Sequence, residues 1–178
     1  MLPLLHSSSL RSLVFPRIRR IDSCVFDSVV SNSSLREISF EYMNLISEDL
    51  AKVAKSNSVL NKLDILECGF SFSFSPLFNS IEANSSLMEL DIRLSMKPLN
   101  GRELLSLLKM LELNSTLVVL ILHGALFESL KGVLDVLKVN SVLKKVTFPS
   151  LKLGCLIDIL EANLPSSIIS YPPSLNQF

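Results

Sequence analysis

The side chains that could carry chemistry are few and scattered. His6 and His123 are the two imidazoles, and each could serve as a general base or a metal ligand only with suitable partners nearby. No nucleophile elbow, glycine-rich phosphate loop or metal-binding pair accompanies either histidine. Several acidic residues fall where helices are expected to begin or to face solvent: Glu48, Asp49, Glu128 and Asp135. We therefore predict no catalytic residue, no metal site, no cofactor and no enzymatic activity.

Cysteine usage bears on the compartment. Cys24, Cys68 and Cys155 are an odd number of cysteines at wide spacings, without a Cys-x-x-Cys motif. A disulfide framework or a zinc site is therefore not expected. The N-terminus lacks the charged start, long apolar core and small-residue cleavage site of a secretory signal. These observations favour a reducing, cytoplasmic location.

The charge balance limits the classes of partner. The chain carries 17 basic and 17 acidic residues, so its formal net charge is zero and gives no bulk attraction to nucleic acid or acidic lipid. A basic cluster lies near the N-terminus, at Arg11, Arg17, Arg19 and Arg20. We interpret it as a solvated helix start, with a nucleic-acid or targeting role as the less favoured alternative. The longest nearly uncharged apolar stretch, 113–127, is too short to span a bilayer as a helix. We predict neither nucleic acid nor a membrane as a partner.

A repeated tetrad, Asn-Ser-x-Leu, organises the chain. Its five clear copies begin at Asn32, Asn57, Asn84, Asn114 and Asn140. The spacings are 25, 27, 30 and 26 residues, in the range of a short solenoid repeat. A degenerate sixth copy begins at Ser7. The leucine of each tetrad starts the pattern Leu-x-x-Φ-x-Φ, where Φ is apolar, which is typical of a short strand with one buried side. The tetrad's Asn and Ser are expected at a tight turn, bonding backbone groups that a helix end leaves unsatisfied.

Some of the tetrads match a glycosylation signal. Asn32, Asn84 and Asn114 fit the acceptor pattern Asn-x-Ser/Thr. Asn57 and Asn140 hold the same repeat position without fitting it. We therefore interpret the match as a by-product of the repeat.

Between the tetrads the apolar period becomes helical. Counting back from each Asn, positions −7, −4 and −3 are mostly apolar, and this spacing lies on one helical face. The clearest sets are Leu50/Val53/Ala54, Leu107/Met110/Leu111, Val133/Val136/Leu137 and Leu156/Ile159/Leu160. Each unit is thus predicted to be one strand and one helix, and stacked units bury their apolar sides against one another. Because strands are about 4.8 Å apart and helices nearer 10 Å, we expect a curved stack with the sheet on the concave face.

This layout resembles the leucine-rich repeat family, specifically its long-repeat class typified by ribonuclease inhibitor. The resemblance rests on Asn-Ser-x-Leu-x-x-Leu-x-Ile/Leu, clearest over 57–65 and 84–92, and covers roughly residues 7–163. It implies an α/β fold: a curved leucine-rich-repeat solenoid of about six repeats, with a strand and a helix in each and a parallel sheet on the concave face. We expect this domain to span residues 1–171, followed by an irregular tail over 172–178.

The chain departs from the family pattern in two ways. The family places Asn or Cys at the ninth position, where a buried polar group bridges adjacent turns. Here those positions hold Ile18, Met43, Cys68, Ser95, Ala125 and Leu151. With only Cys68 matching, the bridging ladder is expected to be largely missing and the array less rigid. The ends also lack polar capping repeats, which suggests an improvised cap, a truncated larger protein or self-association through the uncapped ends.

One strand breaks the polar trend of the predicted concave surface. Outward positions two, three and five of the fifth strand are all apolar: Val118, Val119 and Ile121. The neighbouring strands supply Met88, Glu89 and Asp91 on one side and Lys144 and Lys145 on the other. An apolar area rimmed by opposite charges is typical of a protein-binding hot spot. Coverage by a neighbouring loop or by the C-terminal tail is an equal alternative. Tyr42 and His123, just beyond their strands, would add an aromatic and a polar contact at the rim.

We therefore predict a non-enzymatic interaction module that binds another protein, of unpredicted identity, through its concave face. The family resemblance suggests a rival, a GTPase-activating protein of the Ran type. The zero net charge disfavours it, since such proteins usually carry a strongly acidic region. A fragment of a larger repeat-containing sensor or scaffold, or a decayed copy without independent function, is the remaining alternative.

Overall fold

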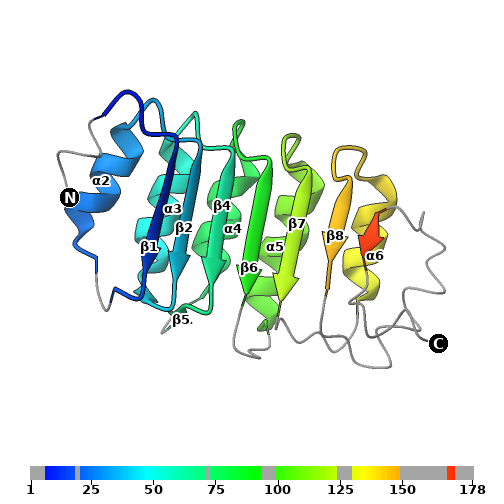
Figure 1. The fold of residues 1–178 in the computed structure, drawn as a ribbon. Coiled ribbons are helices and arrows are strands. Elements are labelled where there is room, and N and C mark those ends of the chain that lie inside the picture. Colours follow the sequence, from blue (N-terminus) through cyan, green and yellow to red (C-terminus); the bar gives the residue numbers. More distant parts are fainter. Residues whose placement is uncertain are drawn as a thin grey trace.

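The computed structural model describes residues 7–18, 21–70, 73–93, 99–123, 130–148 and 168–170. These residues form a parallel sheet of seven strands with helices packed against one face (Figure 1). The sheet strands are β1 (Ser12–Pro16), β2 (Glu37–Glu41), β4 (Lys62–Leu66), β6 (Glu89–Arg93), β7 (Val119–His123), β8 (Lys145–Thr147) and β9 (Ile169–Ser170). The helices are α2 (Ser23–Ser31), α3 (Ser47–Ser56), α4 (Ser75–Glu82), α5 (Gly101–Leu113) and α6 (Lys131–Val139). The layers are therefore one sheet and one row of helices.

The strands lie in the sheet in their chain order, β1-β2-β4-β6-β7-β8-β9. Each pair is parallel, and equivalent repeat positions lie side by side: Leu63 pairs with Leu90, and Leu90 with Leu120. This register follows from the repeat, because a shift by one residue would turn every buried leucine to the outside.

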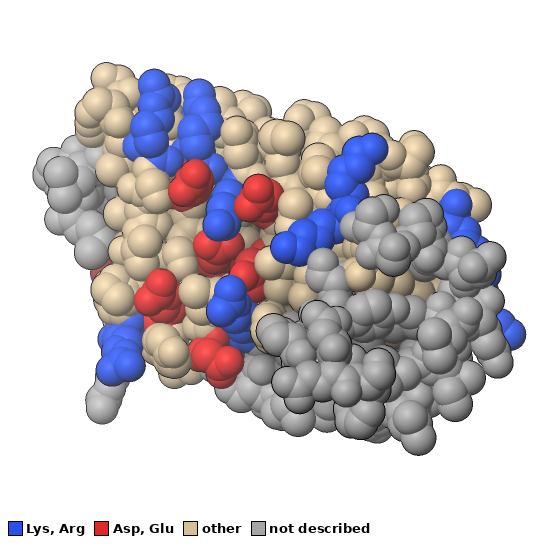
Figure 2. Space-filling view, turned by 45° about the vertical axis from the view of Figure 1, so that its right-hand side comes forward, with Lys and Arg blue, Asp and Glu red and all other residues tan. Residues whose placement is uncertain are grey.

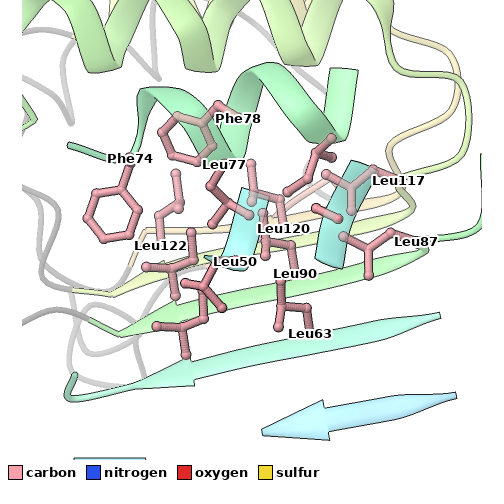
Figure 3. Close-up of a cluster of buried hydrophobic side chains, with 14 of the residues drawn as sticks. Leu50, Leu63, Phe74, Leu77, Phe78, Leu87, Leu90, Leu117, Leu120 and Leu122 are labelled. Carbon is pink, nitrogen blue, oxygen red and sulfur yellow. The ribbon is translucent and has the colours of Figure 1, made fainter. Parts of the chain in front are cut away.

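The predicted alternation within each strand is confirmed. Positions one, four and six of the strand pattern are buried from β2 to β8, as at Leu87, Leu90 and Ile92. In the first copy Leu10 and Leu13 are partly buried, and Phe15 is buried. Figure 3 shows leucines of successive strands meeting Phe74, Leu77 and Phe78 of the α4 region, between sheet and helices.

The predicted helix faces also point into the core. Leu50, Val53 and Ala54 of α3 are buried, as are Leu107, Met110 and Leu111 of α5. The face that was predicted before Asn163 lies outside the described residues. α5, the longest described helix at 13 residues, begins with a capping box. There the Asn100 side chain accepts from the Glu103 amide, and the Glu103 carboxylate accepts from the Asn100 amide.

The tetrad asparagines bridge one unit to the next at the helix ends. Asn114 Nδ2 donates to the carbonyls of Ile81 at 2.7 Å and Asn84 at 3.0 Å, both in the preceding unit. Its Oδ1 accepts from the amides of Thr116 and Leu117. Three more copies bridge in the same way: Asn57, Asn84 and Asn140. The bridging role that was expected to be lost is thus performed at the opposite end of the strands.

This bonding also bears on the glycosylation signal. Asn84 and Asn114 are buried, and each uses its Nδ2 atom in bonds to the preceding unit. A glycan is attached through that same atom, so it is incompatible with this arrangement.

The ninth position is apolar in the first units, as the sequence indicated. Met43 is buried, and Cys68 Sγ donates to the Phe40 carbonyl of the preceding unit at 3.3 Å. Burial raises the pKa of the Cys68 thiol, which keeps it protonated. The ninth-position residues 95, 125 and 151 lie outside the described ranges.

Two features were not predicted. β9 pairs in parallel with β8, through Val146 and Ile169, where the sequence pattern had degraded. β3 (Asn44–Leu45) and β5 (Gly69–Phe70) form a separate two-stranded sheet. The expected boundary between residues 171 and 172, and the tail beyond it, lie outside the described residues. In the described part of the chain, no helix has the length and apolar character needed to cross a membrane.

Candidate protein-binding surface

The face of the sheet that is turned away from the helices, here called the sheet face, is built from three rows of side chains. The in-register pairing places residues from successive strands next to one another in each row. The first row is Ser12, Glu37, Lys62, Glu89, Val119 and Lys145. The second is Val14, Ser39, Asp64, Asp91, Ile121 and Thr147. The third is Pro16, Glu41, Leu66, Arg93 and His123.

Four apolar residues come together around β7 and form what we call the apolar strip: Met88, Val118, Val119 and Ile121. The Met88 carbonyl accepts from the amides of Val118 and Val119, which places Met88 beside the start of β7. Met88 is 47% exposed, whereas Val118, Val119 and Ile121 are half-buried. The strip is therefore partly accessible.

The predicted charged flanks of the strip are adjacent to it in the structure. Glu89 and Asp91 of β6 pair in register with Val119 and Ile121. On the other side Lys145 of β8 pairs with Val119, and the Lys144 amide donates to the Val118 carbonyl. Glu89, Lys144 and Lys145 are exposed. Asp91 is only 8% exposed, less accessible than an outward position suggests.

Carboxylates predominate on β2, β4 and β6, the strands that precede β7 in the sheet. We call the outward acidic residues of β2, β4 and β6 the acidic patch: Glu37, Glu41, Asp64, Glu89 and Asp91. Lys62 and Arg93 are the two basic residues among them in these rows. Figure 2 shows acidic side chains gathered on one part of the visible surface, with Lys and Arg side chains among them.

Arg93 neutralises one member of the acidic patch. Its guanidinium donates to both carboxylate oxygens of Asp91, at 2.9–3.3 Å. This hydrogen bond raises the pKa of Arg93 above its ordinary value. Lys62 forms longer ion pairs than Arg93 does, with its Nζ atom 3.5 Å from Asp64 and 3.9 Å from Glu89. Asp91 is therefore held in a forked pair, whereas Asp64 and Glu89 share one lysine.

Asp64 is the carboxylate with unmet hydrogen-bonding capacity. Its Oδ1 atom is buried and has no hydrogen-bond partner within the described residues. Burial raises the pKa of Asp64, with nearby Asp91 adding to the rise and Lys62 opposing it. On the far side of the strip, the buried Thr147 hydroxyl likewise has no partner among the described residues. Each side of the strip thus carries a buried polar atom that lacks a hydrogen bond within the described residues.

The two rim residues are placed differently. His123 ends β7 and pairs in register with Arg93. Burial lowers the pKa of His123, and the charge of Arg93 lowers it further, so its neutral form is favoured. Tyr42 follows β2, separated from β7 by β4 and β6. It is 54% exposed, and Arg17 lies 5.0 Å from its ring centroid. Tyr42 therefore does not border the apolar strip.

Tyr42 belongs to a set of strained turns at the carboxyl ends of the strands. Within the described ranges Arg17, Tyr42 and Glu67 have positive φ angles of 47°, 52° and 50°. All three hold the eighth repeat position, and each amide donates to a carbonyl of the next strand. The left-handed conformation is thus a repeated feature of the fold.

Sequence reasoning missed two residues of this surface, Glu41 and Arg93. Both hold the seventh repeat position, which faces outward because the strand alternation continues beyond position five. The spacing of Asp91 and Arg93, two residues apart on one strand, could have indicated their pairing. Asp64 was placed on the outward face, but its burial depends on neighbouring strands.

No protein-family model matches the chain, and no curated protein sequence matches it. Several solved structures are similar to it, among them the following two. The C-terminal domain of tropomodulin from Caenorhabditis elegans has a TM-score of 0.63 at 14% identity, covering 78% of this chain and 90% of that one. Leiomodin-1 actin-binding site 2 has a TM-score of 0.57 at 11% identity, covering 90% of this chain and 84% of that one. The likeness shows the fold alone.

The comparison corrects the family resemblance. The expected ribonuclease-inhibitor-like class is wrong, since the similar structures are tropomodulin and leiomodin domains. The repeat pattern predicts a strand and a helix in each unit but does not distinguish between the classes of protein that stack such units. This chain joins its units through the tetrad asparagines at the helix ends, and the two buried ninth-position residues are Met43 and Cys68. The coarser expectation of an α/β fold with a parallel sheet is confirmed.

Proposed function

We propose that the chain is a non-enzymatic protein-binding module whose partner packs on the sheet face around the apolar strip. In this proposal the stack of strand–helix units is curved and the sheet face is its concave side. The carrying observation is the half-buried apolar row of β7 between Glu89 and Asp91 on one side and Lys145 on the other. Apolar centres with charged rims are the usual anatomy of a protein interface.

A capture experiment with two matched variants tests the proposal. Val119→Asp is expected to abolish capture of a partner from lysate by immobilised protein, because it buries a charge at the centre of the contact. Leu105→Asp makes the same kind of change on α5, where Leu105 is 69% exposed, and should leave capture intact. Both variants should keep the wild-type circular dichroism. Unfolding by Val119→Asp would instead indicate that the strip belongs to the core, and equal capture by both variants would refute the proposal.

Actin is the first partner to test, because one similar structure is leiomodin-1 actin-binding site 2. Fold similarity at 11% identity supports the choice of actin as a test and carries no residue-level correspondence. Co-sedimentation with actin filaments and gel filtration with monomeric actin should be run with wild type and Val119→Asp. If the wild type binds filamentous or monomeric actin and Val119→Asp does not, actin is identified as the partner.

The Ran-type GTPase-activating alternative remains a prediction from the sequence. Single-turnover GTP hydrolysis with candidate small GTPases tests it. An unchanged rate of GTP hydrolysis at a saturating concentration of this protein would exclude the GTPase-activating alternative.

A further inference from the structure

The apolar strip lies directly beside the acidic patch, so a partner that covers one must also meet the other. A stable interface buries about 800 Å² on each side. A roughly circular contact of that size, centred on β7, reaches about three strand spacings of 4.8 Å in each direction. It therefore extends across β6 and β4, whose outward side chains include Asp64, Glu89 and Asp91.

Covering these carboxylates with apolar groups alone would strip them of water without replacement. Within the described rows of β2, β4 and β6, five acidic residues face two basic ones. Arg93 is already committed to Asp91, and Lys62 is shared between Asp64 and Glu89. Since the whole chain has zero formal net charge and the exposed Lys144 and Lys145 lie on the other side of the strip, this excess is local to β2, β4 and β6.

We propose that the sheet face binds a protein segment in which basic and apolar side chains are interspersed, with its cations over Asp64 and Glu89 and its apolar side chains on Val119 and Ile121. This inference rests on the proposed function and names the class of partner. Charge complementarity decides the class, because Asp64 and Glu89 share a single lysine, Lys62, and a cationic partner supplies further positive charge beside them.

Three synthetic peptides test the partner class with the intact chain. They have the same length and the same leucine positions, and their polar positions are filled by Lys, by Gln or by Glu. Fluorescence anisotropy at physiological salt measures the affinity of each. The Lys peptide should bind at least about ten-fold more tightly than the Gln peptide, and the Glu peptide should show no saturable binding. Equal affinity for the Lys and Gln peptides would overturn the inference.

Two matched charge reversals distinguish binding at the acidic patch from attraction to the net charge of the chain. Glu89→Lys on β6 and Glu112→Lys on α5 change the net charge equally, and both side chains are exposed. Glu89→Lys should weaken binding of the Lys peptide about five-fold, the size expected for reversing a partly exposed charge, and Glu112→Lys should leave it unchanged. Equal effects of the two variants would indicate non-specific attraction and refute the inference.

Asp64→Asn and Val119→Asn complete the test. Asp64→Asn should weaken binding of the Lys peptide without lowering the melting temperature, which a merely structural role would not produce. Val119→Asn removes apolar contact without adding charge. It should lower the affinity for the Lys peptide and for the Gln peptide equally. If only Val119→Asn has an effect, the partner-class inference fails and the proposed function stands. If neither has an effect, both fail.

Discussion

At the scale of single residues, Asp64 differs from the other acids of the sheet face. Its neighbour Asp91 is held by a two-oxygen contact with Arg93, whereas the buried Oδ1 atom of Asp64 finds no partner in the described structure. A buried polar atom without a hydrogen bond destabilises the fold by about 1–3 kcal/mol. Such a group is expected where a surface is shaped for a ligand more than for stability.

Asp64→Asn should therefore stabilise the free protein at neutral pH, by up to about 1 kcal/mol, because it removes the desolvated charge. Burial raises the pKa of Asp64 above the ordinary 3.8, so the folded state holds this proton more tightly than the unfolded state. The unfavourable contribution of Asp64 is present above the raised pKa and is relieved as pH falls through it. The advantage of Asp64→Asn should accordingly shrink on acidification, as measured by urea unfolding at several pH values.

Asp27→Asn is the control for this prediction. Asp27 forms an exposed ion pair with Lys52, and exposed ion pairs contribute little to the free energy of unfolding. Its replacement should change stability by less than about 0.5 kcal/mol at every pH. A destabilised Asp64→Asn variant would mean that the contact with Lys62 outweighs the burial of the carboxylate.

The surface residues show which parts of the site were predictable. Strand alternation was sufficient to place Val119, Ile121 and Asp91 on one face, since it depends on the local period alone. The burial of Asp91 and the unmet oxygen of Asp64 depend on side chains from three different strands. Tyr42 was assigned to the rim because it follows a strand, but two strands separate it from β7.

At the scale of elements, the tetrad asparagine is the residue that joins one strand–helix unit to the next. The sequence predicted that it would satisfy a helix end. It could not indicate that the Asn114 side chain also reaches the carbonyls of Ile81 and Asn84, because that contact exists only after stacking. The strands and helices were predicted correctly because they follow from the local period, whereas the period does not decide between classes of strand–helix repeat, and there the family assignment failed.

Asn114→Ala tests this bridging. The substitution leaves the buried amide of Leu117 without its side-chain acceptor and removes one of the hydrogen bonds to the Ile81 carbonyl, which keeps a bond from the Asn84 amide. Loss of these bonds should lower the free energy of unfolding by about 2–4 kcal/mol in urea denaturation.

Asn79→Ala is the matched comparison, since Asn79 is exposed on α4. It should leave stability unchanged or raise it by about 0.5 kcal/mol, because alanine favours the helix. If Asn114→Ala and Asn79→Ala had equal effects, the asparagine bridges would contribute nothing to stacking.

At the scale of the whole molecule, the repeat separates structure from recognition. One side of every strand, and the facing side of each helix, is used to build a continuous core. The other side of the sheet is free of that demand, so its composition varies from acidic on β2, β4 and β6 to apolar on β7. The layered fold was predictable from periodicity, whereas β9 was not, since its two residues follow no repeat.

We propose above all that a partner protein contacts the apolar strip. Site-specific photo-crosslinking tests it most directly, with a benzophenone side chain placed at Val119 in one protein and at Leu105 in another. Both positions carry an apolar residue, on the sheet face and on the outer surface of α5 respectively. We expect a discrete crosslinked partner from position 119 and none from position 105. A partner crosslinked from 105 and absent from 119 would contradict it.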